Sequence, residues 1–197
     1  MNFKESETKK NLLRAFAGES QARNRYTFAA ETAAAQKNYV VEAVFKFTAE
    51  QELAHAEVFY EHLKEENGEN IEIDAAYPVN VSSDLCELLE AAVHNETEEY
   101  EDAYKNFAEC AKTEGFPEIA YSFENIAKIE KTHADRFANI LKLLKENKLF
   151  VSDCKTGFMC LNCGNIIEVT EVPQVCPVCQ HERGYFIRLE FAPYSSK

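Results

Sequence analysis

The sequence is poor in positive charge: 21 Lys and Arg residues stand against 34 Asp and Glu residues, which leaves a formal net charge of −13. Nucleic acids and anionic membranes attract basic surfaces, so neither is expected as a partner. The chain also lacks an apolar run long enough to span a bilayer, and residues 1–6 lack the apolar core of a signal peptide. We therefore expect a cytoplasmic protein that does not associate with membranes.

Proline is absent from the first part of the chain. No proline interrupts residues 6–36, where apolar residues recur at intervals of three, four and seven. This spacing predicts a long helix. Further helices are expected at 39–66, which ends before Asn67 and Gly68, at 84–115, which Asp84 begins, and from Pro117 to 147. The chain thus provides four helices of roughly 28 residues, each about 42 Å long.

Residues 68–83 lack helical periodicity. Fully extended, these 16 residues reach about 50 Å, which is enough to run the whole length of a bundle. We therefore expect two antiparallel hairpins joined by a long crossover. This is the connectivity of a ferritin-like four-helix bundle.

Two copies of the pattern Glu-x-x-His occur, at Glu52 to His55 and at Glu130 to His133. Residues three apart share one helix face, so each copy presents a carboxylate and an imidazole to one point. A further carboxylate precedes each copy: Glu19 lies 33 residues before the first copy, and Glu96 lies 34 residues before the second. Measured from the turns of their own hairpins, all four carboxylates lie at similar depth. The sequence therefore predicts that they converge on one layer of the bundle.

The internal repeat is broken at Glu99, which shares a face with Glu96, whereas Ala22 stands at the matching place after Glu19. The predicted site thus holds five carboxylates and two imidazoles. The alternative, that these are ordinary surface acids, does not explain why they share stripes with apolar residues. Burying so many like charges without a cation would be prohibitive. A carboxylate-rich core with two histidines suits a pair of ions such as iron or manganese.

The last forty residues contain two Cys-x-x-Cys pairs separated by 12 residues, and the four thiols are Cys160, Cys163, Cys176 and Cys179. Thiolates at this spacing form a tetrahedral site for zinc or for a single iron. Residues 166–169 and 185–189 have the composition of short strands. The expected domains are a helical bundle at 1–147, a linker at 148–157 and a small β domain at 158–197. We assign no role to Cys86, Cys110 and Cys154.

These motifs, in this order and over nearly the whole chain, resemble the rubrerythrin family. The segment Gly18-Glu19-Ser20 and the pair Glu96 and Glu99 add to the likeness, whereas the chain departs from the family at residues 93–95, where Ala-Gly is usual. The resemblance implies a non-haem di-iron centre in the bundle and a rubredoxin-like iron on the four cysteines, where zinc is a substitute. It also implies a homodimer in which the tail of one subunit lies near the di-iron site of the other.

The resemblance also implies roles for single residues. Glu52 and Glu130 would bridge the two irons, Glu19 and Glu96 would be terminal ligands, and His133 would complete one iron. The other iron would exchange Glu99 for His55 when the site is reduced. Tyr26 and Tyr104 match family tyrosines that form hydrogen bonds near the site, although core tyrosines with satisfied hydroxyl groups would look the same in the sequence.

The activity implied by the resemblance is the reduction of hydrogen peroxide to water in defence against oxidative stress. Electrons would pass one at a time through the rubredoxin-like iron from a rubredoxin or from an NADH-dependent flavin or rubredoxin reductase. The main alternative is a ferritin-like ferroxidase or iron-storage protein, which would explain the bundle but neither the tail nor Glu99. A second alternative is a module without catalytic activity that holds zinc in both sites.

Overall fold

The first half of the bundle is one helical hairpin. In the computed structural model, which describes residues 2–193, α1 (Glu7–Ala35) follows a short turn, η1 (Phe3–Glu5), and begins where the Ser6 side chain accepts a hydrogen bond from the Lys9 backbone. Lys37 adopts a positive φ of 60° in the turn, and Asn38 caps α2 (Tyr39–Glu61). The helix expected to reach residue 66 ends at Glu61, and η2 (Lys64–Glu66) continues it as a separate turn.

The second hairpin contains a wider helical turn. The Asp84 side chain caps α3 (Leu85–Glu98), which passes through the π-helical turn η3 (Glu99–Ala103) into α4 (Tyr104–Glu114). Gly115, at a φ of 90°, ends α4 in the left-handed conformation that glycine adopts freely, and α5 (Pro117–Lys145) begins with proline as its first residue. The single helix expected at 84–115 is therefore two α-helices, α3 and α4, joined without a break by one π-helical turn.

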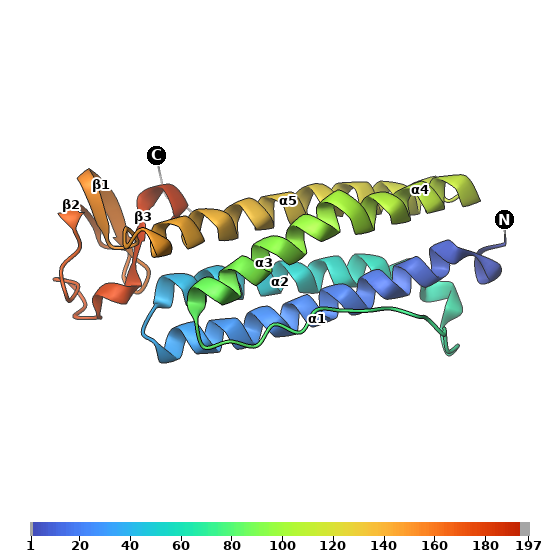
Figure 1. Ribbon diagram of the computed structural model, residues 1–197, viewed down its shortest axis with the longest axis horizontal. Coiled ribbons are helices and arrows are strands. Elements are labelled where there is room, and N and C mark those ends of the chain that lie inside the picture. Colours follow the sequence, from blue (N-terminus) through green and yellow to red (C-terminus); the bar gives the residue numbers. More distant parts are fainter. Residues whose placement is uncertain (1, 194–197) are drawn as a thin grey trace.

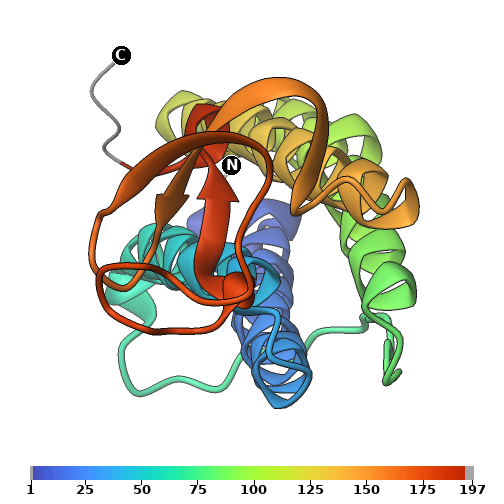
Figure 2. The same ribbon diagram turned by 90° about the vertical axis from the view of Figure 1, so that its left-hand side faces the viewer.

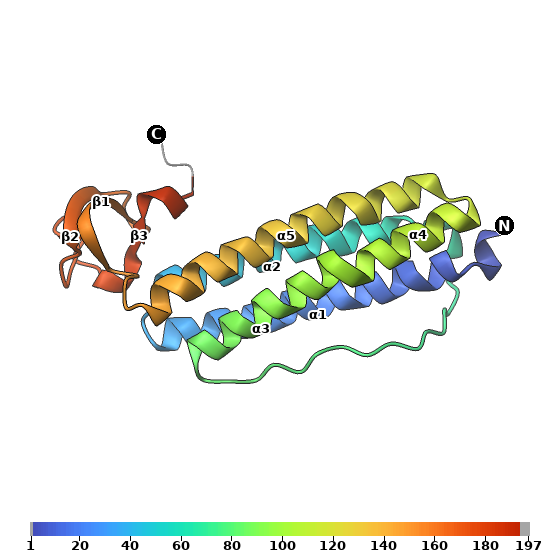
Figure 3. The same cartoon turned by 45° about the horizontal axis from the view of Figure 1, so that its top comes forward.

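The crossover is as long as the sequence predicts. Residues 67–84 contain no helix or strand and run along the outside of the bundle from one end to the other, beside α1 (Figures 1 and 3). The ferritin-like connectivity is confirmed. Within the described residues, no helix combines the length and the apolar character needed to cross a membrane.

The apolar core of the bundle has two parts. One lies toward the small sheet and is built around Phe45, Leu89 and Phe137, and the other lies toward the opposite end around Phe59 and Phe123. Between them lies a layer of buried polar side chains drawn from the long helices. The packing on both sides holds this layer in place, because close-packed cores allow little side-chain movement.

The C-terminal part is a three-stranded antiparallel sheet in the order β2-β1-β3, made of β1 (Val151–Cys160), β2 (Ile166–Glu171) and β3 (Phe186–Arg188). β2 and β3 confirm the two expected strands. β1 begins inside the segment 148–157 that we expect to be a linker: residues 151–157 belong to the strand, and Val151, Thr156 and Gly157 pair with β2 on either side of an irregularity in the register. Its polar residues at 152–156 give no apolar alternation that would predict a strand. Residue 1 and residues 194–197, at the outer ends of the two expected domains, lie outside the described part of the chain.

The small sheet lies at one end of the bundle (Figures 1 and 2). The turn η4 (Arg183–Tyr185) contacts the turn between α1 and α2: the rings of Tyr39 and Tyr185 stack with centroids 3.9 Å apart, and Lys37 Nζ lies 2.6 Å from Glu182 Oε1. Gly184 allows this approach, because a Cβ there would lie 2.0 Å from the Lys37 carbonyl oxygen. A last turn, η5 (Leu189–Phe191), follows β3. Contacts close to the backbone thus hold the sheet against the bundle.

Candidate metal centres

Six ionisable side chains make up the polar layer of the bundle. Glu19, Glu52, Glu96, Glu130 and His133 have no exposed surface, and His55 is 6% exposed. The carboxylates come one each from α1, α2, α3 and α5, and the imidazoles come from α2 and α5 one turn after Glu52 and Glu130. The predicted convergence of the repeated motifs is confirmed.

Each imidazole faces its own set of carboxylates. His133 Nδ1 lies 2.8 Å from Glu130 Oε2, 3.0 Å from Glu52 Oε1 and 3.3 Å from Glu96 Oε2. His55 Nδ1 lies 3.0 Å from Glu130 Oε1 and 3.2 Å from Glu52 Oε2, with Glu19 Oε2 at 3.7 Å. Glu52 and Glu130 therefore direct one oxygen to each side. The layer consists of two adjacent groups that share two carboxylates, and the candidate ligand atoms within each group lie within 4.8 Å of one another.

Burial and mutual repulsion change the acidity of these groups. Burial raises the pKa of the Glu19 and Glu96 carboxyl groups well above the usual range, and the negative charges of Glu130 and Glu52 add to the effect. Burial lowers the pKa of His133, but its contacts with Glu130 and Glu52 outweigh burial and raise that pKa to about 11. The pKa of His55 is raised for the same reason. The layer therefore attracts positive charge, whether as protons or as metal ions.

These shifts predict how the metal-free bundle responds to pH. The raised pKa of His133 stabilises the fold fully below its ordinary value near 6.5, and this stabilisation is lost as the pH rises toward 11. One group of this kind lowers the free energy of unfolding by about 3 kcal/mol between pH 7 and pH 9. This corresponds to a fall of roughly 5 to 10 °C in the melting temperature. Thermal unfolding of the metal-free protein should show this fall, and the same protein loaded with iron should not. A melting temperature that stays constant or rises in the metal-free protein would contradict the prediction.

Two tyrosines connect the halves of the repeat. The Tyr26 hydroxyl on α1 donates a hydrogen bond to Glu96 Oε1, and the Tyr104 hydroxyl on α4 donates one to Glu19 Oε1 at 2.5 Å. Both tyrosines are almost fully buried. Tyr26 follows Glu19 by seven residues, whereas Tyr104 follows Glu96 by eight, and the π turn accommodates the additional residue. The same one-residue difference accounts for the repeat lengths of 33 and 34.

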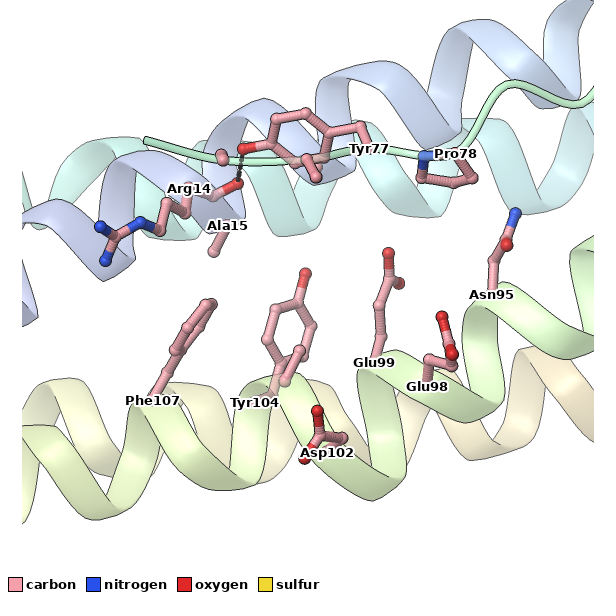
Figure 4. A pocket seen from close by; sticks show the side chains of 14 residues that line it. Arg14, Ala15, Tyr77, Pro78, Asn95, Glu98, Glu99, Asp102, Tyr104 and Phe107 are labelled. Atoms are coloured by element: carbon pink, nitrogen blue, oxygen red, sulfur yellow. Dashed lines mark hydrogen bonds between the residues drawn. The ribbon is translucent and has the colours of Figure 1, made fainter. Parts of the chain in front are cut away.

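Glu99 lies beside the layer and not in it. It is the first residue of the π turn, and its carboxylate belongs to neither of the two groups found among the described residues. It lines a neighbouring pocket together with Tyr104 (Figure 4). Burial raises the pKa of Glu99 well above the usual range, and the charges of Glu96 and Glu19 raise it further. In this structure His55 therefore belongs to the group with Glu19, Glu52 and Glu130, and Glu99 lies outside that group.

The four cysteines of the tail form a second cluster. The Sγ atoms of Cys160 and Cys179 lie 3.8 Å apart, and those of Cys163 and Cys176 lie 3.7 Å apart. Metal–sulfur bonds of about 2.3 Å in a tetrahedron require sulfur atoms about 3.8 Å apart, so the spacing fits one tetrahedral ion. The His181 backbone N–H lowers the pKa of the Cys179 thiol to about 6, which favours the thiolate that binds a metal.

Comparison with known proteins agrees with this pair of sites. Residues 10–141 match the family model described as rubrerythrin, and residues 158–187 match the rubredoxin-like domain of rubrerythrin. The chain belongs to the rubrerythrin family. A rubrerythrin of Clostridium perfringens is 42% identical over 186 residues, covering 94% of this chain and 95% of that protein. A rubrerythrin of Porphyromonas gingivalis is also 42% identical, covering 94% of this chain and 91% of that protein.

The fold comparison gives the same family resemblance in three dimensions. The solved structure of nigerythrin in a mixed-valence state matches with a TM-score of 0.62 and 25% identity, covering 93% of this chain and 90% of that one. A bacterioferritin of Desulfovibrio desulfuricans matches with a TM-score of 0.63 and 25% identity, but it covers 72% of this chain. The nigerythrin match thus covers a larger share of this chain than the bacterioferritin match does.

The residues present fit the metals that this family implies. Within residues 2–193, buried atoms without a hydrogen-bond partner include both carboxylate oxygens of Glu52 and of Glu130 and the Nδ1 atoms of both imidazoles. These atoms approach one another closely but are not aligned as hydrogen bonds, and they point at shared positions. Two cations would satisfy them and neutralise the layer. The buried cluster fits a di-iron site, and the four cysteines fit a rubredoxin-like metal site.

Sequence reasoning did not identify the residues that cover the site. Asn95 Nδ2 donates a hydrogen bond of 2.9 Å to Asn80 Oδ1 on the crossover, and the Tyr77 hydroxyl donates one of 2.8 Å to the Arg14 carbonyl oxygen on α1. The one indication in the sequence is the departure from the family at residues 93–95. The path of an extended segment follows no periodic rule, so these contacts required the structure.

Proposed function

We propose that this protein is a peroxidase that reduces hydrogen peroxide to water with electrons relayed through an iron held by its four cysteines. The overall change is H₂O₂ + 2e⁻ + 2H⁺ → 2H₂O. The observation that carries the proposal is the presence in one chain of a buried carboxylate and imidazole site for two ions and a separate site of four thiols. An iron store needs the first site and has no use for the second.

In this proposal the shared carboxylates are the bridges. Glu52 and Glu130 would each bind both irons, since each directs one oxygen to either group. Glu19 and Glu96 would be terminal ligands, with His55 and His133 completing the two groups. Tyr104 and Tyr26 occupy the other oxygen of each terminal carboxylate, so they orient those ligands.

The bound iron pair would supply two electrons to the O–O bond of the peroxide. Glu99 is the proposed proton source. Its pKa is raised well above the usual range, which favours the protonated carboxyl group, and it lines the pocket beside the site. The resemblance assigns the arrangement with His55 bound and Glu99 free to the reduced site. His55 and Glu99 would thus exchange as the site cycles.

The proposed electron donors follow from the four-cysteine site. An iron on four thiolates transfers one electron at a time, so the donor would be a rubredoxin or an NADH-dependent flavin or rubredoxin reductase. We also propose a homodimer. The small sheet contacts Tyr39, and Glu52 lies 13 residues further along α2, about 20 Å away along the helix axis. A tail from a second subunit would offer a shorter path to the site.

The test is an anaerobic iron and zinc count with visible spectra before and after hydrogen peroxide is added to the reduced protein. We expect about three irons per chain and a rubredoxin-like colour that bleaches on reduction and returns with peroxide. Zinc on the cysteines with no peroxide-dependent change would overturn the relay. A large iron-filled cage would instead favour the ferroxidase or storage alternative, and zinc in both sites would favour a module without catalytic activity.

A further inference from the structure

The crossover covers a pocket beside the candidate di-iron site. The pocket, about 360 Å³ in volume, lies between α1, residues 75–78 of the crossover, and the path from α3 to α4 (Figure 4). Its inner wall includes Glu99 and Tyr104, and the Tyr104 hydroxyl contacts the buried carboxylate of Glu19. A molecule in this pocket would therefore lie beside the side chains that surround the metals.

Hydrogen bonds hold the crossover over this pocket at two places. Beside the pocket, the Tyr77 hydroxyl donates to the Arg14 carbonyl oxygen, while Arg14 Nε donates to the Asp74 carbonyl oxygen at 3.0 Å. Further along, Asn95 donates to Asn80, and Asn95 also lines the pocket one turn before Glu99. The covering segment is thus attached to α1 on one side and to α3 on the other, and its position over the pocket is defined.

The pocket is larger and less polar than hydrogen peroxide requires. A water molecule takes up roughly 30 Å³ in the liquid, and hydrogen peroxide has only two oxygen atoms. Part of the wall has side chains that form no hydrogen bonds, namely Ala15, Ala75, Ala76, Pro78 and Phe107. Apolar surface of this kind gains free energy when it contacts hydrocarbon in place of water.

The charge of the wall selects against anions. Two exposed acidic residues, Glu98 and Asp102, line the pocket. Arg14 is the one cationic residue in the described lining, and its Nη1 atom is paired with Glu7 Oε1 at 2.5 Å and with Asn11 Oδ1 at 2.7 Å. An uncharged guest avoids repulsion from the carboxylates, whereas an anionic guest does not.

We propose that this pocket admits uncharged hydroperoxides to the di-iron site and that small organic hydroperoxides are substrates together with hydrogen peroxide. The carbon group would rest on the apolar wall, and the O–O group would face Glu99 and Tyr104. The reaction would be ROOH + 2e⁻ + 2H⁺ → ROH + H₂O: the O–O bond would break, and a bound, reduced iron pair would supply both electrons. The inference rests on the proposed peroxidase function and extends its substrate class.

The test compares two tryptophan variants of the crossover. Ala76 lines the pocket and is exposed, so Ala76→Trp fills the mouth without burying new side-chain volume in the core. Val79 lies three residues further on, is 87% exposed and is outside the described lining, so Val79→Trp is the matched control. Single-turnover oxidation of the reduced protein is followed with hydrogen peroxide and with tert-butyl hydroperoxide. Saturation-transfer NMR with tert-butanol on the zinc-loaded protein reports binding without turnover.

The expected results separate the two proposals. Both oxidants should react with the unaltered protein. Ala76→Trp should slow oxidation by tert-butyl hydroperoxide at least tenfold and oxidation by hydrogen peroxide less than about threefold. It should also abolish the tert-butanol signal in the NMR experiment. Val79→Trp should change none of these three quantities.

Three outcomes would overturn the inference. If hydrogen peroxide reacts and tert-butyl hydroperoxide does not, the organic substrate class is wrong and the peroxidase function stands. If the two variants behave alike with tert-butyl hydroperoxide and tert-butanol, the pocket is not the route. If neither oxidant reacts with the unaltered protein, the peroxidase function itself fails, and the organic substrate class falls with it.

Discussion

Replacing Glu52 with alanine is expected to remove both metal ions from the bundle. Glu52 directs one carboxylate oxygen to the group around His133 and the other to the group around His55, so a single substitution takes a ligand from both ions. The iron content should fall from about three to about one per chain, and the rubredoxin-like colour should remain, because the four cysteines lie in a separate part of the chain. Metal analysis and visible spectra of the anaerobically purified variant measure both quantities.

The matched control for this change is Glu57→Ala on the same helix. Glu57 is exposed and lies two residues after His55, so its loss should leave all three irons in place. A Glu52→Ala protein that still bound about three irons would show that the shared carboxylate does not bridge two ions. The two-ion interpretation of the layer would then fail.

Replacing Cys160 and Cys176 with serine is expected to separate the two halves of the reaction. The reduced variant should still be oxidised once by hydrogen peroxide, because the carboxylate layer lies between the two parts of the bundle core. Steady-state turnover with an external donor should fall at least 100-fold, because electrons can no longer pass through the thiolate-bound iron. Stopped-flow oxidation and steady-state peroxide consumption measure these two quantities. Full steady-state turnover in the variant would exclude the relay.

Two controls protect this result from a loss of folding. Cys154→Ser changes an exposed cysteine outside the cluster and should have no effect on turnover. Zinc placed on the four cysteines of the unaltered protein keeps the small sheet folded but carries no electrons, so it should reproduce the loss of turnover. If the zinc form turned over at the full rate, the tail would have a structural role only.

Local rules explain why much of this molecule could be predicted. The Glu-x-x-His motifs place two ligand types on one helix face, and the Cys-x-x-Cys pairs place two thiols in one turn, so short spacings were sufficient in both cases. The cap at Asp84 and the left-handed Gly115 marked helix ends in the same way. The expectation of a linker at 148–157 missed the start of β1, because β1 is a strand through its pairing with β2 and not through a pattern in its own sequence.

The sequence by itself determined the four helices, the long crossover, the layer of carboxylates and imidazoles, and the thiol cluster, because each depends on spacings of a few residues or on the length of a segment. Tertiary structure alone decided that a π turn accommodates the additional residue of the second half, and with it that Glu99 faces a pocket. It also decided that Tyr26 and Tyr104 each contact a carboxylate from the opposite half of the repeat. It also decided that hydrogen bonds of Tyr77 and Asn80 attach the crossover that covers this pocket. These contacts join residues 15 to 85 positions apart, and they form only when packing of the whole bundle brings distant surfaces together.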